Sequence, residues 1–420
     1  MMEMRICEDA EPKLVVDNLY KVFGCNQQRA VSGLKSGACK ETIKEEMGST
    51  VGVNEVSFEV YPGEMFIVMG LSGSGKSTLL RCVNRLTEPT AGDIYIDGQS
   101  VVSMSQHELR QLRRNKLGMV FQQFALFPHR TVLDNTAYGL EVQGMSRAKR
   151  YRQAEEILNM VGLDGWGSSY PGNLSGGMQQ RVGLARALVH DPDILLMDEP
   201  FSALDPLIRR EMQNELLQLQ EELNKTILFI THDLDEAMRL GDRIAIMNDG
   251  KIVQIGTAQQ ILMNPANDYV RAFVEDVDRF KVLTTGEVMV EPEPLLHPED
   301  SLQSAVHDME DCSSWYAPVV SSDERFLGMI SSEEAAVAAT NGTRSIVEIL
   351  NRDVHRATGR EVLQDVVSII ARESLPVAVV DERNHLRGIV DASAMLSGLI
   401  EGPGEEPDQR TDLPRRRAGN

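Results

Sequence analysis

Short apolar runs in the first two-thirds of the chain alternate with segments whose apolar residues recur at helical spacing. The apolar runs predict buried strands at residues 65–69, 117–121, 193–198, 226–231 and 243–247. The helical spacing is clearest at residues 154–161 and 210–223. Because buried strands that alternate with helices favour a mostly parallel sheet covered on both faces, we predict an α/β fold.

The chain before residue 65 follows a different pattern. Residues 14–24 predict a strand that runs into a turn, and residues 51–60 alternate apolar and polar positions as a half-buried strand does. Residues 25–50 between them are polar and have no strong period, which indicates an insertion or a partly helical excursion. A further short strand at 93–98 and a charged helix at 105–114 are also predicted.

After about residue 280 the pattern changes to an internal repeat. Residues 319–331 match residues 379–391 at an offset of 60. Each copy predicts a short strand, a polar turn, a second strand and then a helix, and a helical stretch precedes each copy. Residues 401–420 combine Pro, Gly and charges without an apolar period, so we expect a disordered tail.

Length and composition narrow the class of protein. A chain of 420 residues is too long for one hydrophobic core, so two or three domains are expected. The formal net charge of −21 argues against wholesale binding of nucleic acid, which requires a basic surface. No apolar stretch is as long as a membrane span, and the N-terminus lacks the apolar core of a signal peptide. We therefore expect a cytoplasmic chain whose membrane association goes through a partner.

A glycine-rich segment at residues 70–78 fits the phosphate-binding pattern G-x-x-x-x-G-K-[ST], between a predicted strand and a predicted helix. Its glycines let the backbone wrap around a phosphate, and its N–H groups and the helix N-terminus form an anion site. Lys76 is expected to reach the β- and γ-phosphates, and the Ser77 hydroxyl to ligate Mg²⁺. The predicted binding residues of this phosphate loop are Gly70, Ser72, Gly73, Ser74, Gly75, Lys76, Ser77 and Thr78.

Asp198 and Glu199 end another predicted buried strand, downstream of the phosphate loop. A carboxylate in this place holds Mg²⁺ in nucleotide hydrolases, and its neighbour orients or deprotonates the attacking water. Positioned proton transfer of this kind contributes about 10²–10⁴-fold in rate. For these two residues alone, a solvated Asp-Glu pair at a turn is an equally open interpretation.

A second candidate anion site lies at the start of a predicted helix, where Ser175, Gly176 and Gly177 follow one another. The free N–H groups of the helix start provide the donors. One nucleotide cannot accommodate both the phosphate loop and this helix start from the same chain. The helix start is therefore expected to bind the nucleotide of a partner subunit. An ordinary serine N-cap is the alternative.

Three single residues lie at the ends of predicted strands. Gln122 is placed to touch Mg²⁺ or the lytic water and His232 to contact a γ-phosphate, although a lone Gln or His is usually structural or solvated. Phe23 is placed to stack on an adenine face, worth about 1–3 kcal/mol by analogy with base–aromatic stacking in nucleic-acid complexes. A core role for Phe23 is equally open.

The order of these motifs resembles the ATPase subunit of ABC transporters, over about residues 14–274. The resemblance implies a P-loop NTPase domain with an antiparallel β subdomain and a helical subdomain, which uses ATP and Mg²⁺. It also implies a homodimer that sandwiches two ATP molecules head to tail, with Asp205 at the seam. Met178 departs from the glutamine of the commonest signature, which is expected to change detail rather than activity.

The resemblance implies a role for each candidate residue. Glu199, His232 and Gln122 are the implied catalytic residues. The implied metal ligands are Ser77, Gln122 and Asp198. Phe23 matches the aromatic that stacks on adenine, and Ser175, Gly176 and Gly177 would face the ATP held by the other subunit.

A finer resemblance is to the ATPases of glycine betaine/proline-type osmoprotectant importers. It rests on the insertion before residue 51, the loop at 70–75, the run 201–212 and residues 264–270. It implies the motor of an importer that works with transmembrane permease subunits and a periplasmic or membrane-tethered substrate-binding protein. Such a subunit sits peripherally on the cytoplasmic face of the inner (plasma) membrane and binds no nucleic acid.

The C-terminal repeat resembles a tandem CBS pair, which gives a predicted domain order. Residues 1–50 hold the first strand and the insertion, residues 51–278 the ABC ATPase domain, residues 279–400 the CBS pair and residues 401–420 the tail. Where nucleotide-binding CBS pairs commonly carry an Asp, this chain has Glu334 and Ala394. A regulatory, an ionic-strength-sensing and a dimer-stabilising role of the pair therefore all stay open.

Two other functions compete with an importer motor. One is a non-transport member of the same superfamily that acts on DNA or ribosomes, but such proteins tend to carry two ATPase halves or a long coiled coil. This chain has one signature and no sustained heptads. The other is a CBS-regulated binding module, in which the CBS pair is the working part.

Overall fold

The computed structural model describes residues 11–275, 277–373 and 375–400. The tail predicted at 401–420 lies outside these residues. The chain divides into two compact units, one that ends at Val277 and one that begins at Asp278. In the described part of the chain, no helix is long and apolar enough to cross a membrane.

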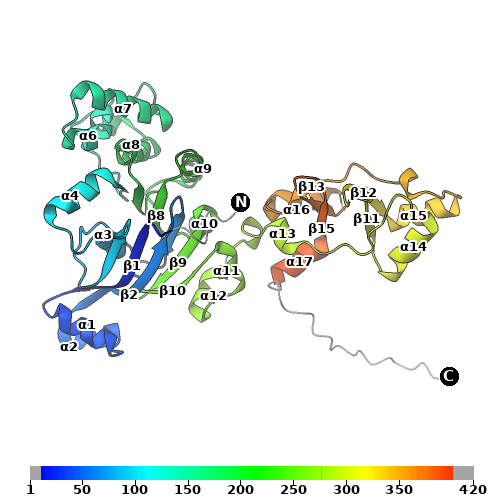
Figure 1. Cartoon of the computed structure of the whole chain (residues 1–420), viewed down its shortest axis with the longest axis horizontal. Helices are drawn as coiled ribbons and strands as arrows, with labels where there is room; N and C mark the ends of the chain where they lie inside the picture. The colour runs from blue at the N-terminus through cyan, green and yellow to red at the C-terminus, as the bar shows by residue number, and fades with distance from the viewer. Residues whose placement is uncertain (1–10, 276, 374, 401–420) are drawn as a thin grey trace. The chain divides into compact units, whose positions relative to one another are not determined.

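The first unit is built on a six-stranded sheet in the order β10-β9-β3-β8-β7-β6 (Figure 1). All neighbours in this sheet are parallel except the β9–β10 hairpin. The strands are β3 (Met65–Met69), β6 (Leu117–Val120), β7 (Ile194–Asp198), β8 (Thr226–Thr231), β9 (Arg243–Asn248) and β10 (Lys251–Gly256). The prediction of an α/β fold with a mostly parallel sheet is confirmed.

The register of this sheet brings three strand ends together. Met69 of β3 pairs with Thr231 of β8, and Asp198 of β7 pairs with Ile230 of β8. Because parallel strands place their carboxyl ends at one edge, whatever follows these three strands meets there. Those segments are the phosphate loop, Glu199 and His232.

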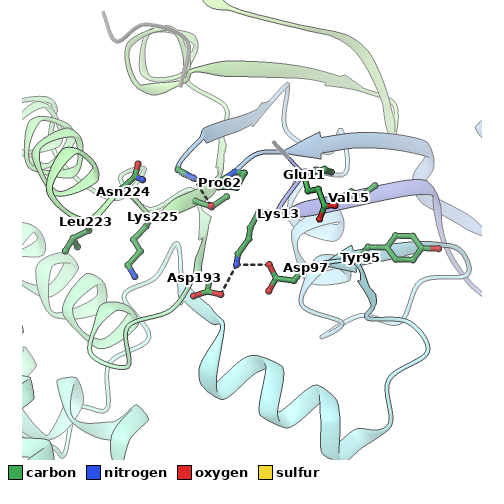
Figure 2. Close-up of a pocket in the computed structure, with 14 residues that line it drawn as sticks. Glu11, Lys13, Val15, Pro62, Tyr95, Asp97, Asp193, Leu223, Asn224 and Lys225 are labelled. Atoms are coloured by element: carbon green, nitrogen blue, oxygen red, sulfur yellow. Dashed lines mark hydrogen bonds and ion pairs between the residues drawn. The ribbon is translucent and has the colours of Figure 1, made fainter. Parts of the chain in front are cut away.

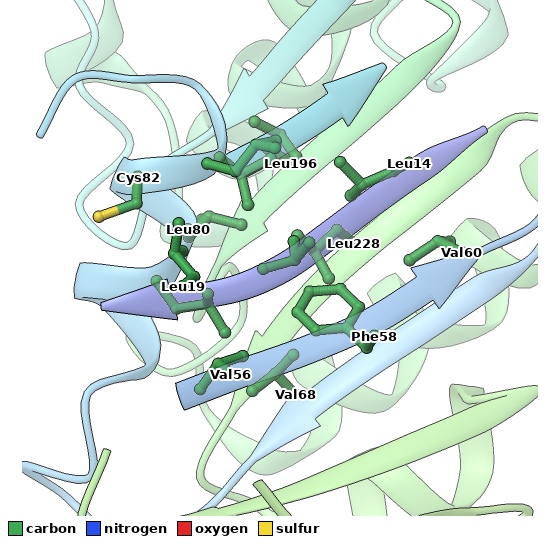
Figure 3. Packing of buried hydrophobic residues seen from close by; sticks show 14 of the residues in the cluster. Leu14, Leu19, Val56, Phe58, Val60, Val68, Leu80, Cys82, Leu196 and Leu228 are labelled. Carbon is green, nitrogen blue, oxygen red and sulfur yellow. The ribbon is translucent and has the colours of Figure 1, made fainter. Parts of the chain in front are cut away.

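A second, antiparallel sheet has the order β2-β1-β4-β5. Its strands are β1 (Leu14–Phe23), β2 (Thr50–Val60), β4 (Ala91–Ile96) and β5 (Gln99–Ser100). Figure 3 shows side chains of both sheets and of α3 (Lys76–Val83) in one hydrophobic core. In this core the rings of Phe58 and Phe66 stack at 4.9 Å, and burial raises the pKa of the Cys82 thiol to about 12. The strand and the helix that flank the phosphate loop are therefore fixed in a closely packed core. Cys82 is a core residue with an unreactive thiol.

Helices cover the sheets and form a separate helical group. After the phosphate loop and α3, the helices of this unit are α4 (Gln106–Asn115), α5 (Val132–Thr136), α6 (Tyr138–Val142), α7 (Arg147–Met160), α8 (Gly176–Leu188), α9 (Pro206–Leu223), α10 (Leu234–Leu240), α11 (Ala258–Met263) and α12 (Asp268–Val274), with a 3-10 turn at Pro171–Asn173. Figure 1 shows α6, α7 and α8 together, away from β1 and β2.

The insertion after β1 is more regular than its sequence suggests. It forms two helices, α1 (Gln27–Lys35) and α2 (Lys40–Met47). Their few apolar residues share a small core with the ends of β1 and β2, made of Tyr20, Val22, Ala30, Val31, Leu34, Ile43 and Val51. Each helix is short and buries only a few residues, so no strong period is visible in the sequence.

The second unit repeats one set of elements. The first copy contains α14 (Leu302–Asp311), β11 (Tyr316–Val320), β12 (Phe326–Ser331) and α15 (Ser332–Thr340), and the second contains α16 (Leu363–Glu373), β14 (Val377–Val380), β15 (Leu386–Val390) and α17 (Ala392–Ile400). Outside this set lie α13 (Thr285–Val288), β13 (Arg356–Thr358) and 3-10 turns at Arg279–Lys281 and Ile346–Glu348.

The two copies hold each other through matched backbone bonds. The N–H of Phe326 donates to the carbonyl of Asn384 at 2.9 Å, and the N–H of Leu386 donates to the carbonyl of Glu324 at 3.2 Å. These residues are the same pair of repeat positions, shifted by the offset of 60. The copies are therefore related by an approximate two-fold arrangement, and the prediction of an internal repeat is confirmed.

Candidate functional site

The phosphate loop joins β3 to α3 and is closely packed against backbone from two other strands. Gly70 and Gly75 have φ angles of +154° and +107°. A Cβ at Gly70 would lie 2.1 Å from the Met247 carbonyl oxygen, and one at Gly75 would lie 2.1 Å from the Gly52 carbonyl oxygen. A Cβ at Gly73 would meet nothing within 4 Å. The loop thus needs glycine for packing at two positions, whereas its outer turn is open.

We expect Gly75→Ala to lower the stability of the first unit by about 1–3 kcal/mol more than Gly73→Ala does, because the added methyl group overlaps the Gly52 carbonyl. Gly73→Ala is the matched control, since φ is also positive there and only the local strain of about 1–2 kcal/mol is added. Thermal unfolding of both variants measures the difference. Equal melting temperatures would contradict the close approach at Gly75.

Lys76 begins α3 and points back under the loop. Its side chain is buried, and Nζ donates to the carbonyl oxygens of Gly70 at 2.8 Å and Leu71 at 3.0 Å. Burial lowers the pKa of the ammonium group, while the nearby carboxylates of Glu199 and Asp198 act to raise it. The ammonium group therefore lies within the loop and close to the two carboxylates, which is where a bound phosphate requires it.

Ser77 and Asp198 form the next part of the site. The Ser77 hydroxyl donates to Asp198 Oδ1 at 2.8 Å, and an Arg81 nitrogen lies 3.9 Å from Asp198 Oδ2. A hydroxyl and a carboxylate are the oxygen donors that Mg²⁺ takes together with phosphate oxygens and water, so this pair fits the ion. Among the described residues no larger cluster of His, Cys, Asp and Glu gathers as a metal site.

Glu199 is the centre of a hydrogen-bonded group. Its Oε2 accepts from Gln122 Nε2 at 3.2 Å and lies 2.9 Å from His232 Nδ1. With Nδ1 as the donor, the other ring nitrogen of His232 is free for a further partner. Gln122 and His232, which were predicted separately, thus both contact one carboxylate oxygen of Glu199. Glu199 is therefore not an isolated, solvated carboxylate at a turn.

The backbone of Glu199 is strained in a way that aims its side chain. Its φ is +45°, an unusual value for a residue other than glycine that costs about 1–3 kcal/mol. Two hydrogen bonds keep the backbone in this conformation. The Glu199 N–H donates to the Ile230 carbonyl oxygen at 3.0 Å, and the Ser202 hydroxyl donates to the Glu199 carbonyl oxygen at 2.9 Å. Such over-determined strain is typical of functional positions.

Phe23 ends β1 beside the phosphate loop. Its side chain is 43% exposed, which rules out a core role. A Cβ at Gly52 would lie 3.0 Å from both the Phe23 ring and the Thr78 methyl group, so these two side chains flank the same point of β2. Lys21 Nζ lies 4.8 Å from the ring centroid on one side. Phe23 therefore offers an aromatic surface next to the loop.

The second candidate anion site is not part of this group. The Ser175 hydroxyl oxygen caps α8 and accepts a hydrogen bond from the Met178 N–H at 3.3 Å. In the same way, Asp205 Oδ1 caps α9 and accepts from the Ile208 N–H at 3.1 Å. Helix α8 packs against α5 and α7 of the helical group and against the edge strand β6, whereas α3 packs against β1, β2 and β8. Ser175, Gly176 and Gly177 are thus presented on a different part of the unit from the phosphate loop.

One residue of the site was missed by the motifs. Arg81 lies four positions after Ser77 on α3, a spacing that puts both side chains on one face of the helix. Its guanidinium group faces Asp198 and is largely exposed, so it places a positive charge beside the phosphate loop. The spacing of four residues from Ser77 in a predicted helix could have indicated Arg81 from the sequence.

A cavity of about 700 Å³ lies elsewhere in the first unit (Figure 2). Lys13 there pairs with Asp97 at 2.7 Å and Asp193 at 2.9 Å. Asp193 and Lys225 directly precede β7 and β8, so the cavity is at the opposite strand ends from the phosphate loop.

The strand–loop–helix, the Ser77–Asp198 pair and the bonded Glu199 define a P-loop nucleotide hydrolase. The family model of the ABC transporter matches residues 53–202, and that of the CBS domain matches residues 286–339. The glycine betaine transport ATP-binding protein OpuAA of Bacillus subtilis is 52% identical over 394 residues, which cover 93% of each chain. The glycine betaine/proline betaine transport system ATP-binding protein ProV of Salmonella typhimurium is 47% identical over 92% of this chain and 97% of its own.

Solved structures agree with these relatives. The dimeric post-hydrolysis structure of the ATP-binding cassette MJ0796 with ADP and Pi covers 58% of this chain and 98% of its own, at 33% identity and a TM-score of 0.50. The chain belongs to the ATP-binding proteins of ABC transporters, and a CBS domain follows its ATP-binding domain. It is therefore a nucleotide-binding ATPase of a transport system, and the resemblance found in the sequence is confirmed.

Proposed function

We propose that this chain is the motor subunit of an importer for an osmoprotectant such as glycine betaine or proline. The observation that supports ATP hydrolysis is the meeting of Gln122 and His232 on one oxygen of Glu199, next to the Ser77–Asp198 pair. The substrate class is supported by relatives that align along almost the whole chain and are glycine betaine transport proteins.

In the proposed mechanism each side chain has one task. The Lys76 ammonium group leaves the two loop carbonyl oxygens and donates to the β- and γ-phosphates of ATP instead. Ser77, Asp198 and Gln122 would hold Mg²⁺, which would neutralise charge on the phosphates. Glu199 orients the attacking water and accepts its proton, and His232 keeps the carboxylate in place and turns its free nitrogen to the γ-phosphate. Phe23 stacks on the adenine.

The proposed functional unit is a head-to-tail homodimer. Ser175, Gly176 and Gly177 lie on a different part of the unit from the phosphate loop, so a second subunit has to bring them to the ATP. Their N–H groups at the start of α8 then face the phosphates across the seam. The dimeric structure of the MJ0796 cassette supports this arrangement.

The proposed partners are transmembrane permease subunits and a periplasmic or membrane-tethered substrate-binding protein. The relatives are named as components of transport systems, which supports partners of this kind. The chain would then lie on the cytoplasmic face of the inner membrane through these contacts. Within it, we assign ATP hydrolysis to residues 1–278 and regulation or dimer stabilisation to the CBS pair at 279–400.

Co-purification tests this function against the non-transport alternative. The tagged full-length chain, expressed with its neighbouring genes, should be recovered from detergent-extracted membranes together with permease subunits. Recovery with ribosomes or DNA and without membrane proteins would contradict the proposal. The Glu199→Gln chain is the matched control, because its assembly with the permease should be unchanged.

A further inference from the structure

Lys21 of β1 is a buried lysine that the proposed mechanism does not use. It is only 7% exposed, although lysine is rarely buried unless its charge is paired. Its Nζ donates to the carbonyl oxygen of Glu88 at 2.9 Å and lies 4.8 Å from the centroid of the Phe23 ring. A carbonyl oxygen and an aromatic face thus take the place of the carboxylate that usually accompanies a buried lysine.

The ammonium group and the solvent lie against opposite sides of the Phe23 ring. Lys21 and Phe23 are two positions apart on β1, a spacing that directs both side chains to the same side of the strand. Lys21 is buried while Phe23 is 43% exposed, so the ammonium group covers the inner face of the ring and the outer face is open. An adenine that stacks on Phe23 therefore meets the face opposite to the cation.

The strand end that carries this pair is fixed against the segment between α3 and β4. Besides the bond from Lys21 Nζ to Glu88, the Val22 N–H donates to the Thr90 hydroxyl oxygen at 3.0 Å. The Thr90 N–H in turn donates to the Tyr20 carbonyl oxygen at 2.8 Å. The ammonium group is therefore held in place under the ring rather than presented on a mobile side chain.

A cation on one face of an aromatic ring changes what the other face binds. The faces of the ring carry the negative part of its quadrupole, and a desolvated ammonium group is attracted to them more strongly than an exposed one. The cation draws electron density of the ring toward itself, so the outer face becomes less negative. Because the face of adenine is itself rich in electrons, a less negative partner face stacks on it more strongly.

We infer that Lys21 is a positioning residue for adenine: its ammonium group holds the Phe23 ring from the buried side and prepares the open face for the base. Lys21 itself does not touch the nucleotide in this arrangement. The inference rests on the proposed function, because it requires adenine to stack on Phe23.

The test compares the Kd of ADP with the Kd of inorganic pyrophosphate, measured by titration calorimetry on full-length chains. ADP carries the base, whereas pyrophosphate reaches the phosphate loop without one. Lys21→Met keeps the length of the side chain and removes the charge. The Kd of ADP should therefore rise about 3- to 10-fold, and the Kd of pyrophosphate should stay unchanged.

Two comparisons separate this role from a general effect on the fold. Lys35→Met is the matched control, because Lys35 Nζ lies 5.4 Å from the ring of Tyr20 on the same strand, and it should leave the Kd of ADP unchanged. In a Phe23→Ala chain, Lys21→Met should have no further effect, because the ring through which it acts is absent. Lys21→Gln, which is also uncharged, takes the place of Lys21→Met if that variant does not fold.

Three results would overturn the role of Lys21 and leave the proposed function standing. They are a wild-type Kd of ADP in Lys21→Met, equal increases for ADP and pyrophosphate, and the same increase in the Phe23→Ala chain as in the wild type. Wild-type binding of ADP by Phe23→Ala would overturn the stacking of adenine and the role of Lys21 together. A wild-type chain that does not bind ADP would overturn the proposed function as well.

Discussion

Replacing Glu199 by Gln should abolish ATP turnover while leaving ATP binding intact. The amide keeps the shape and the contacts with Gln122 and His232 but cannot accept a proton from water. The expected loss is about 10²–10⁴-fold in kcat. The measurement is phosphate release at saturating ATP, with Glu221→Gln on the exposed face of α9 as the matched control.

The same variant should accumulate as an ATP-bound closed dimer, since hydrolysis is what reopens it in the proposed cycle. Cross-linking in the presence and absence of ATP detects that state. Phosphate release at the wild-type rate from Glu199→Gln would remove Glu199 from its assigned role.

Replacing Lys76 by Ala should weaken ATP binding about 10- to 100-fold, the effect of losing one charge-assisted hydrogen bond to a phosphate. The side chain is buried under the loop, so water does not replace it well. A binding titration with ATP measures the loss, and Lys149→Ala, an exposed lysine of α7, should bind like the wild type. Unchanged affinity in Lys76→Ala would contradict the assignment of the phosphate loop.

Most of the side chains of the proposed catalytic site could be predicted, because each one directly follows a recognisable buried strand. The loop follows β3, Glu199 follows β7 and His232 follows β8. Parallel strands end at the same edge, so sequence order alone brings them together. The sequence could not decide between a core position and an exposed position for Phe23, because an aromatic residue at the end of a strand is compatible with both.

Other parts of the site depend on contacts between distant segments that have no local signal. The amphipathic pattern of α1 and α2 is too short to detect, and their core exists only with Tyr20, Val22 and Val51 of the adjoining strands. The place of Ser175 at a nucleotide depends on a second chain, so neither one sequence nor one folded chain determines it.

ATP hydrolysis by this chain is expected to drive import of an osmoprotectant. The most direct measurement is uptake of labelled glycine betaine into vesicles that contain the reconstituted complex and internal ATP, with proline, choline and carnitine as competitors. We expect ATP-dependent uptake by the wild-type complex and none by the Glu199→Gln complex. Hydrolysis without uptake of any of these solutes, or equal uptake with Glu199→Gln, would contradict it.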